Sequence, residues 1–560
     1  MKLPDTLLRL LFYALWLSVS LWQGWVTEIF DDEAYYWKYA QLLAWGYYDH
    51  PPMVALLIKA GFTLFKNELG VRLFTIALGT ATIYALERLV KPANLKLFYA
   101  LILSIAVLHF IGFLALPDAP LLFLSVVFLL AYRSFCEEQN LWNAVLLSFV
   151  VCGMLLSKYH AVLPIAFTVL SNLRLLRSTY FWIIVLLAAV VLTPHLYWQY
   201  TNNFPSLQYH LAGRSTDAYT IVYTLQYLAS LPFLFGPFAG MVFLVAAVKV
   251  SPNNTFEKAL KWNWWGVYVF FLLMSFKGRV ETHWTMIALA PSVYFGYRYL
   301  EANDKLRKWF YRSVPVAVLL ILFLRVVVVF DILPKHPLAD SVRNDYLGWK
   351  TWALTIKQKA ESRPVLFMNS YKRAARYEFY AGSLGVSYNN IMGRQNQYDI
   401  WNYEDTLRGK EVMLIPNYPV GGFESFETEK GSLQYTYISN FQSHACIKLS
   451  ADDVPASCQP SDSFRISLKA ALPKNTYVDL EENSNYLPYV SYQFFRGRTL
   501  VLEEVTSILL TNELLEKGKD IQLQLHTPSE PGKYGLYFSV KTGWLPPTYN
   551  SKRYAVEVKK

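Results

Sequence analysis

The sequence has few charged residues and few cysteines. Only 17% of its 560 residues are Asp, Glu, Lys or Arg, whereas 54% are hydrophobic. Soluble domains carry closer to a quarter charged residues, so the composition favours an integral membrane protein with a soluble part attached. The chain has four cysteines, too few for a disulfide scaffold.

Three further features are missing. The net charge is +11, but no basic stripe with a recognisable RNA- or DNA-binding motif accompanies it, which argues against a nucleic-acid partner. No glycine-rich nucleotide-phosphate loop appears, so a nucleotide ligand is not indicated. We find no internal repeat or low-complexity tract, which excludes a solenoid.

Long apolar segments dominate the first 332 residues. They lie at 7–26, 68–90, 96–114, 119–135, 140–156, 160–173, 180–198, 222–249, 263–276, 285–299 and 313–332. A span needs about 20 apolar residues, so we predict about 11–13 transmembrane helices, with 51–66 as an extra short or interfacial segment. The first segment has no small-residue cleavage site behind it, so we expect an anchor rather than a removed signal peptide.

Basic residues gather in alternate loops, which predicts the topology. With eleven spans, the loops around Lys2, Arg88, Arg133, Arg174 and Lys305 all fall on one side, which the positive-inside rule makes cytoplasmic. The other loops are expected to face outward, together with everything after the last span. These outward loops are 27–67, 115–118, 157–159, 199–221 and 277–284.

The region after the last span predicts two soluble domains. In 333–428, "PVLFMN" and "EVMLIPN" predict strands and "SYKRAARYEFYAG" predicts a helix ended by glycine, which together indicate a small α/β domain. In 429–560, short alternating runs such as "FRISLKA", "DIQLQLHT" and "YGLYFSV" indicate a β-sandwich. We therefore expect a membrane domain at 1–332 followed by these two outward domains.

Two cysteines lie in the last domain. Cys446 and Cys458 are close enough in sequence to close a short loop by a disulfide, which an oxidising compartment would permit. Spacing alone cannot prove pairing, so two unpaired thiols remain the alternative.

Ionisable and aromatic side chains collect in the outward loops of the membrane domain. Polar groups at membrane ends are expensive to keep and often functional. The candidates are Asp31, Asp32, Glu33, Asp49 and His50 in the first loop, Asp118 in the second, Lys158 in the third, His195 and the stretch ending at Arg214 near the fourth, and Lys277, Arg279, Glu281, His283 and Trp284 in the fifth.

Each candidate also has a structural interpretation. Asp31 or Asp32 could cap a helix, and Asp118, between two prolines, could shape a tight turn. Lys158 and Arg279 could extend from span ends towards the interface. His50 could be a solvated loop histidine, and Trp284 an interface anchor.

Several motifs together resemble a known family. "DDEAYYWKYAQ…DHPPM", "ALPDAPL", "SKYHA" and "NNFPSLQYH" resemble the ArnT-like and protein O-mannosyltransferase-like membrane glycosyltransferases of the GT-C class. The resemblance continues through "SYKRAARYEFY" and "GRQNQYDIW" and covers roughly residues 1–420. It implies a polytopic helical membrane protein with the GT-C fold, followed by a periplasmic α/β region; the β-rich tail has no counterpart in it.

The resemblance implies an inverting sugar transfer from a polyprenyl-phosphate carrier to a lipid A-like glycolipid, protein or glycan at the outer face of a bacterial inner membrane. It suggests three sets of residues: Asp32, Glu33 and Asp118 as catalytic acids; Lys158, Arg279, His50 and Tyr35 for the donor phosphate; and Tyr36, Asp49, Lys277, His283 and Trp284 for the sugar or acceptor. Many ArnT-like members carry Lys at the position of His50 and some carry Arg at that of Tyr35.

The chemistry is consistent with these residues. Transfer from a phosphate-linked sugar needs a base for the acceptor hydroxyl and charge stabilisation for the departing phosphate. Because acids lie near His50, a divalent metal remains an alternative in this loop. The alternative from another class is a transporter or flippase that uses the acids as ion or proton sites. Transporters usually place such residues near the midplane and show paired halves, whereas these charges collect at one face.

Overall fold

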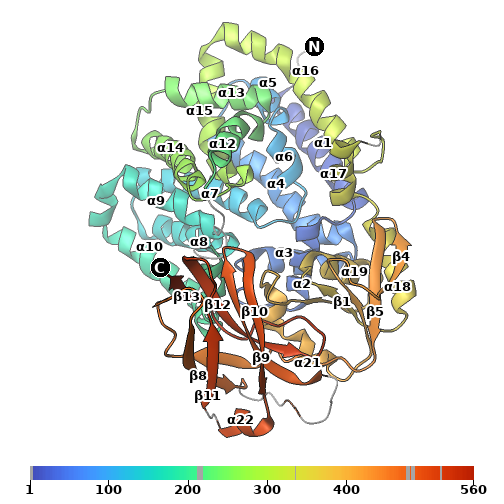
Figure 1. The fold of residues 1–560 in the computed structure, drawn as a ribbon. Coiled ribbons are helices and arrows are strands. Elements are labelled where there is room, and N and C mark those ends of the chain that lie inside the picture. Colours follow the sequence, from blue (N-terminus) through green and yellow to red (C-terminus); the bar gives the residue numbers. More distant parts are fainter. Residues whose placement is uncertain are drawn as a thin grey trace. The chain divides into compact units, whose positions relative to one another are not determined.

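The structure, a computed structural model, describes residues 4–210, 219–334, 336–473, 478, 480, 486–517 and 520–559. Arg214 lies outside them. Residue contacts divide the chain into two compact units, Met1–Trp349 and Lys350–Lys560. Helices form the first unit and strands dominate the second (Figure 1).

The first unit is helical throughout its described residues. Its α-helices are α1 (Asp5–Val26), α2 (Asp31–Gln41), α3 (Met53–Leu64), α4 (Glu68–Val90), α5 (Leu95–Leu103), α6 (Ala106–Ile111), α7 (Asp118–Glu137), α8 (Leu141–Ser157), α9 (Val162–Ser171), α10 (Thr179–Thr201), α11 (Pro205–Gln208), α12 (Ile221–Leu234), α13 (Pro237–Lys249), α14 (Thr255–Ser275), α15 (Leu289–Ala302), α16 (Asp304–Val327) and α17 (Pro337–Tyr346). Short 3-10 helices lie at Tyr159–Ala161, Leu173–Arg177 and Thr282–Ala288.

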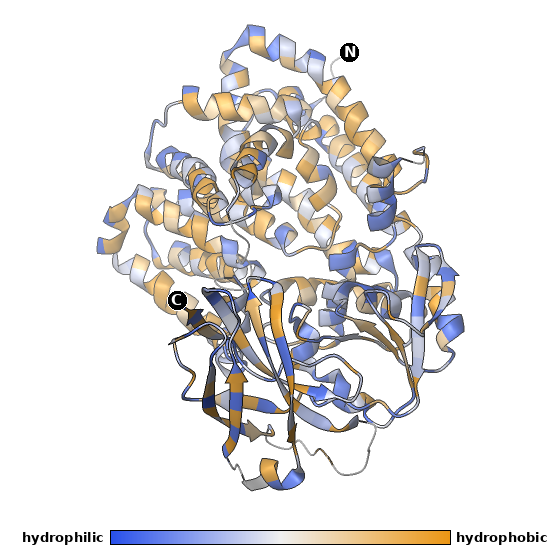
Figure 2. Cartoon of the chain, in the orientation of Figure 1, coloured by the Kyte–Doolittle hydropathy of each residue, from blue (hydrophilic) through white to orange (hydrophobic). Residues whose placement is uncertain are grey.

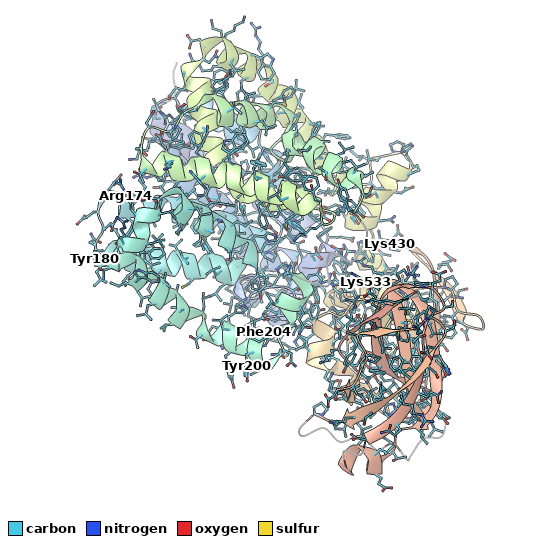
Figure 3. All side chains as sticks on the ribbon, turned by 60° about the vertical axis from the view of Figure 1, so that its left-hand side comes forward. Arg174, Tyr180, Tyr200, Phe204, Lys430 and Lys533 are labelled. Carbon is cyan, nitrogen blue, oxygen red and sulfur yellow. The ribbon has the colours of Figure 1, made fainter. Side chains whose placement is uncertain are left out.

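Five of these helices are long and apolar enough to cross a membrane: α1, α4, α7, α10 and α16. The pair α12 and α13 passes the same test together but bends by 104°, which gives up to six. Figure 2 shows these helices as largely hydrophobic ribbons, in contrast to the alternating colours of the strands. In Figure 3, Arg174 and Tyr180 mark one end of α10, and Tyr200 and Phe204 lie at the other. The chain is therefore a multi-pass membrane protein.

This number is lower than the predicted 11–13, because several apolar segments are broken or short. The segment 96–114 divides into α5 and α6, and the segment 160–173 holds only the ten-residue α9. The helix α8 has 17 residues and α15 has 14, fewer than the about 20 that a perpendicular span requires. Hydropathy alone does not reveal such breaks.

The second unit contains the predicted α/β and β-rich regions. Its elements are α18 (Trp349–Ala360), β1 (Val365–Met368), α19 (Tyr371–Ala381), β2 (Gly385–Tyr388), α20 (Gln397–Trp401), α21 (Tyr403–Leu407), β3 (Val412–Ile415), β4 (Glu424–Thr428), β5 (Gly431–Ile438), β6 (Lys448–Ala451), β7 (Ser457–Cys458), β8 (Ser463–Ala471), β9 (Pro488–Arg496), β10 (Thr499–Leu509), α22 (Asn512–Lys517), β11 (Asp520–His526), β12 (Gly532–Thr542) and β13 (Tyr554–Val558).

Three sheets organise this unit. The first has the order β2-β1-β3-β5-β4, with β1 parallel to β2 and β3, and β5 antiparallel to its neighbours. The strands β1, β2 and β3 are buried along their whole length, as expected for parallel strands covered on both faces. The other sheets, β10-β9-β12-β13-β7 and β11-β8-β6, share one apolar core, which makes a β-sandwich.

The boundaries between these regions differ from those predicted. The first unit extends to Trp349 rather than 332, because the Trp349 amide donates to Glu28 Oε2 at 2.6 Å and Tyr346 stacks on Phe30 at 5.3 Å. The α/β sheet also extends beyond 428, because β5 pairs with β3.

The predicted disulfide between Cys446 and Cys458 is wrong, since both are free cysteines. Cys446 precedes β6 in one sheet of the sandwich, whereas Cys458 lies in β7 of the other, opposite Val558. The Cys446 sulfur instead accepts a hydrogen bond from Arg408 at 3.6 Å. Burial raises the pKa of the Cys446 thiol to about 11, which disfavours the thiolate needed for oxidation.

Candidate active site

The acidic cluster that follows α1 forms the first turn of α2. The backbone amide of Phe30, the N-cap residue, donates to Glu33 Oε2 at 3.0 Å, and the Asp32 amide donates to Asp31 Oδ1 at 2.8 Å. Carboxylates in a first turn also interact favourably with the positive end of the helix dipole. Asp31 and Asp32 remain partly accessible, whereas Glu33 is fully buried. The same turn thus holds one structural acid and two that can meet a ligand.

Glu33 is paired with Arg72, an arginine inside the predicted second span. Arg72 Nε and Nη2 donate to the two Glu33 oxygens at 2.8 and 2.6 Å, and both side chains are 0% exposed. The same guanidinium donates to the carbonyls of Gly24, Thr27 and Glu28 at the end of α1. Arg72 therefore joins α4 to the corner between α1 and α2.

Glu33 also holds the loop that precedes α7. The amide of Ala115 donates to Glu33 Oε1 at 2.7 Å, three residues before Asp118. The carboxylate of Glu33 thus accepts hydrogen bonds from Phe30, Arg72 and Ala115, which lie on three different segments. The geometry thus favours a positioning role for Glu33 over the predicted catalytic role. Glu33 fixes the turn that carries Asp32 and the loop that precedes Asp118.

The loop after α2 presents a second acid. Tyr39 Oη donates to Asp49 Oδ1 at 2.6 Å, and the rings of Tyr39 and Tyr47 stack at 4.0 Å. Tyr47 Oη in turn donates to the Tyr39 carbonyl at 3.1 Å. Asp49 is 7% exposed, so the tyrosine fixes a carboxylate that is largely removed from water.

His50 follows in a packed environment. Its ring meets that of Tyr36 edge-on at 5.3 Å, and its Nδ1 is buried without a hydrogen-bond partner. Burial lowers the pKa of His50 to about 3, with Asp49, Lys158 and Asp118 among the charges that act on it. His50 is therefore neutral at physiological pH and cannot supply a positive charge for a phosphate, although a neutral imidazole can still donate or accept a hydrogen bond.

A hydrogen-bonded network fixes this loop against α10 and α11. His195 Nδ1 bonds the Trp45 carbonyl at 2.7 Å, and Ser206 Oγ donates to the Tyr47 carbonyl at 2.9 Å. Gln199 connects these two contacts. It donates to Ser206 at 2.8 Å and to Tyr159, and Tyr159 in turn forms a hydrogen bond with His195. Gly46 lies in the same loop, and a Cβ at this position would come within 2.5 Å of the Trp198 ring. His195 thus has a structural role, because it holds the loop after α2 against α10.

Asp118 and Lys158 form a buried ion pair. Asp118 opens α7 and Lys158 ends α8, and Lys158 Nζ lies 2.7 Å from Asp118 Oδ1. Each side chain is 7% exposed. A buried pair of this kind is stable only when its geometry and hydrogen bonds compensate for desolvation, so it is costly to maintain and a candidate functional feature.

The fifth outward loop completes the cluster with aromatic and imidazole rings. The rings of His160 and Trp284 lie 5.2 Å apart, and Trp284 is 6.2 Å from His283. His160 and His283 are both close enough to Asp118 to act on its carboxylate electrostatically. The helices α7, α8 and α14 thus bring the residues of three loops together.

Three predicted residues lie elsewhere. Lys277 and Arg279 are exposed, and Arg279, with 70% of its side chain accessible, lies 3.5 Å from Glu281 rather than in the buried cluster. Tyr35 is buried to 1% and packs against Tyr39 at 4.6 Å, so its surroundings are those of a core residue. Among the described residues no group of three or more His, Cys, Asp or Glu is arranged to hold a metal ion.

The sequence reasoning missed Arg72 and His160. An arginine within an apolar run is an available signal, because a buried charge there requires a partner. His160 lies two residues after Lys158 in the same motif, but only the packing of α14 shows that it meets Trp284.

Comparison with known proteins identifies relatives of this arrangement. Residues 49–198 match the dolichyl-phosphate-mannose-protein mannosyltransferase family. The lipid A galacturonosyltransferase RgtD of Rhizobium johnstonii is 28% identical over 312 residues, which cover 50% of this chain and 62% of the relative, less than two thirds of its length. The crystal structure of ArnT from Cupriavidus metallidurans in the apo state superposes with a TM-score of 0.55 at 12% identity, over 77% of this chain and 98% of ArnT.

The structural match confirms the predicted GT-C fold, and the three matches together bear out the resemblance to ArnT-like membrane glycosyltransferases. At 12% identity, the ArnT match is evidence of the fold alone.

Proposed function

We propose that this chain, which resembles ArnT-like glycosyltransferases in sequence and fold, is an inverting glycosyltransferase of the bacterial inner membrane. It moves a sugar from a polyprenyl-phosphate-linked donor to a lipid A-like glycolipid, a protein or a glycan. The site and the second unit would both face the periplasm. The name of the curated relative, a lipid A galacturonosyltransferase, favours a glycolipid acceptor among the three.

The observation that carries the proposal is the pairing of Asp118 with Lys158 beside Asp49 and His50. The pair supplies a fixed ammonium at 2.7 Å from its carboxylate, in surroundings where water cannot screen the charge. A departing phosphate needs such a preorganised positive charge. The neutral His50 makes Lys158 the cation of this cluster that is best placed for the role.

Asp32 is the proposed base. It lies on the first turn of α2, which the dipole keeps favourable for an anion, and Glu33 fixes that turn to the loop before Asp118. In the transfer step, Asp32 accepts the proton of the acceptor hydroxyl while the acceptor oxygen bonds to the anomeric carbon. The bond from that carbon to the phosphate oxygen breaks, and the polyprenyl phosphate leaves with the electron pair beside Lys158.

The sugar is expected to contact the remaining rings and acids. Asp49, which accepts a hydrogen bond from Tyr39, is the acid that we expect to accept one from a sugar hydroxyl. Tyr36 and Trp284 line the same cluster and are suited to pack on a sugar ring. His283, a neighbour of Asp118, is placed to orient either substrate.

The test is transfer by the purified full chain in detergent, with a polyprenyl-phosphate sugar and a lipid A acceptor, followed by mass spectrometry. We expect Asp32→Asn to lower the rate by about 10²–10⁴-fold, the range for loss of a general base. Asp31→Asn, with the same charge change on the same turn, is the matched control.

Two results would count against the proposal. Full activity of Asp32→Asn would exclude Asp32 as the base. Failure of the wild-type chain to transfer any sugar from the polyprenyl donors tested, combined with movement of a lipid or solute across vesicles, would favour the transporter.

A further inference from the structure

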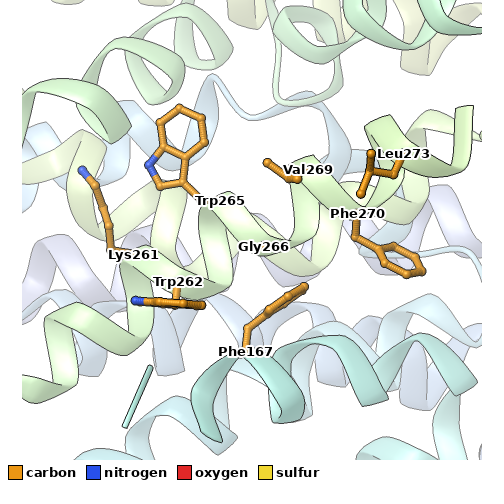
Figure 4. Close-up of a pocket in the computed structure, with 8 residues that line it drawn as sticks. All are labelled: Phe167, Lys261, Trp262, Trp265, Gly266, Val269, Phe270 and Leu273. Atoms are coloured by element: carbon orange, nitrogen blue, oxygen red, sulfur yellow. The ribbon is translucent and has the colours of Figure 1, made fainter. Parts of the chain in front are cut away.

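A groove runs along α14, away from the proposed active site. It has a volume of about 490 Å³ and is lined by Phe167, Lys261, Trp262, Trp265, Gly266, Val269, Phe270 and Leu273 (Figure 4). All but Phe167 of α9 come from α14, and all but Lys261 are apolar. None of them takes part in the proposed transfer.

The apolar wall is continuous and accessible. Trp262, Trp265, Val269 and Leu273 are 43%, 44%, 44% and 55% exposed, and their spacing places them along one side of the helix. Gly266 provides the depth, because a Cβ there would come within 2.5 Å of the Phe167 ring. Because Gly266 has no side chain, α9 and α14 approach each other closely at this position, and the groove lies beside their contact.

The groove is charged at one end only. Lys261 Nζ donates one hydrogen bond, to the Val250 carbonyl at 2.6 Å, and lies 5.1 Å from the Phe295 ring. An ammonium has three donors, so two others remain for a ligand. The exposed Lys258 and Lys249 lie at the same end of α14, whereas the nearby Glu257 is bonded to Arg298 at 2.6 Å.

We infer that this groove binds one anionic phospholipid, with its phosphate at Lys261 and an acyl chain along Val269 to Leu273. The charge of Lys261 selects an anion, and the apolar wall selects a hydrocarbon chain. From Lys261 to Leu273 is twelve residues, or about 18 Å at about 1.5 Å per residue. This length is slightly more than the about 15 Å that one acyl chain spans in half of the hydrocarbon core. The tryptophans flank the phosphate level, as is common for interfacial aromatic residues.

The experiment compares lipid retention by native mass spectrometry. The full chain in detergent is incubated with phosphatidylglycerol or with phosphatidylcholine of the same chains. We expect wild type to retain phosphatidylglycerol preferentially. Lys261→Gln should lower its retention about three- to fivefold, the effect of one partly exposed ion pair. Val269→Trp should lower it further by filling the groove.

Matched variants separate the groove from the rest of the membrane surface. Lys305→Gln changes the same charge on another basic loop, and Val190→Trp adds the same bulk on α10, where Val190 is 61% exposed. Both should retain phosphatidylglycerol like wild type, and all four variants should keep the thermal unfolding temperature of the lipid-free chain. Equal retention of both lipids, or retention unchanged by Lys261→Gln and Val269→Trp, would overturn the inference. Displacement by polyprenyl phosphate at equal concentration would show that a donor-type lipid occupies the groove instead.

Discussion

Glu33 and Asp118 of the helical unit and Glu404 of the second unit are buried carboxyl groups with different kinds of partner. In the helical unit, Glu33 and Asp118 each meet a cation, at 2.6 Å from Arg72 and 2.7 Å from Lys158. In the second unit, Glu404 accepts a hydrogen bond from the hydroxyl of Ser443, and burial raises the pKa of Glu404 to about 8. An acid paired with a cation stays ionised, whereas one held mainly by neutral donors changes charge near neutral pH.

The difference follows from what each region has to do. A transfer site needs charges that are already in place when substrate arrives, because reorganisation would add to the barrier. The second unit has no such requirement in our proposal, so its enclosed acid can exchange a proton without loss of function.

The largest effect is expected from Arg72→Met. Removal of one partner leaves the Glu33 carboxylate buried without its cation, which costs about 3–5 kcal/mol of unfolding free energy. The measurement is unfolding of the full chain in detergent. Arg72→Lys should give an intermediate loss, since an ammonium cannot make the bidentate contact. A change below about 1 kcal/mol for Arg72→Met would contradict a central role of this pair.

Lys158→Met should reduce catalysis more than stability. Loss of the preorganised cation is expected to lower the rate of sugar transfer by about 10²–10³-fold, with a smaller change in acceptor KM. Lys277→Met, at an exposed lysine outside the buried cluster, is the control and should stay near wild type. If both variants lose activity equally, a general surface charge rather than the buried pair is responsible.

Gly46→Ala tests whether the loop that carries Asp49 must approach α10 closely. The new methyl group would lie 2.5 Å from the Trp198 ring, so we expect a loss of about 1–3 kcal/mol in unfolding free energy and reduced transfer. Gly421→Ala is the matched control, because a Cβ there meets nothing within 4 Å. Equal stability of the two variants would show that the loop relaxes freely.

Glu404→Gln should change the pH dependence of stability. The folded Glu404 keeps its proton up to about pH 8, whereas the unfolded group loses it near pH 4.5. Its contribution is therefore fully present below the unfolded pKa and is lost as pH rises towards the folded one. As the pH rises through this range, we expect the melting temperature of wild type to fall by about 2–4 °C relative to that of the variant. This shift corresponds to a loss of about 1 kcal/mol in unfolding free energy. The control is the exposed Glu427→Gln, which should follow wild type.

The smallest effect is expected from reduction. Because all four cysteines are free, dithiothreitol should leave the melting temperature unchanged, and thiol labelling of the unreduced, unfolded chain should find four sites. A downward shift of several degrees would indicate a disulfide between Cys446 and Cys458 after all.

Part of the fold and site was predictable from local patterns. Apolar runs located the helices of the membrane unit, and alternating runs located the strands of the sandwich. The sequence also placed Asp32, Asp118 and Lys158 at the ends of apolar segments, and the structure has them at the first turn of α2, the start of α7 and the end of α8. The breaks within apolar segments were not predictable in this way. At the break of 96–114 into α5 and α6, the Ala106 amide donates to the carbonyl of Phe235, which follows α12.

The sequence by itself determined which residue types are available at the outer ends of the helices, because hydrophobicity and loop charge are local properties. Only the tertiary structure decided their partners. Arg72 and Glu33 are separated by 39 positions, and Asp118 and Lys158 by 40, yet each pair meets within 3 Å. A buried charge can take its counter-charge from any helix that packs beside it, so pairing depends on three-dimensional packing rather than on spacing along the chain.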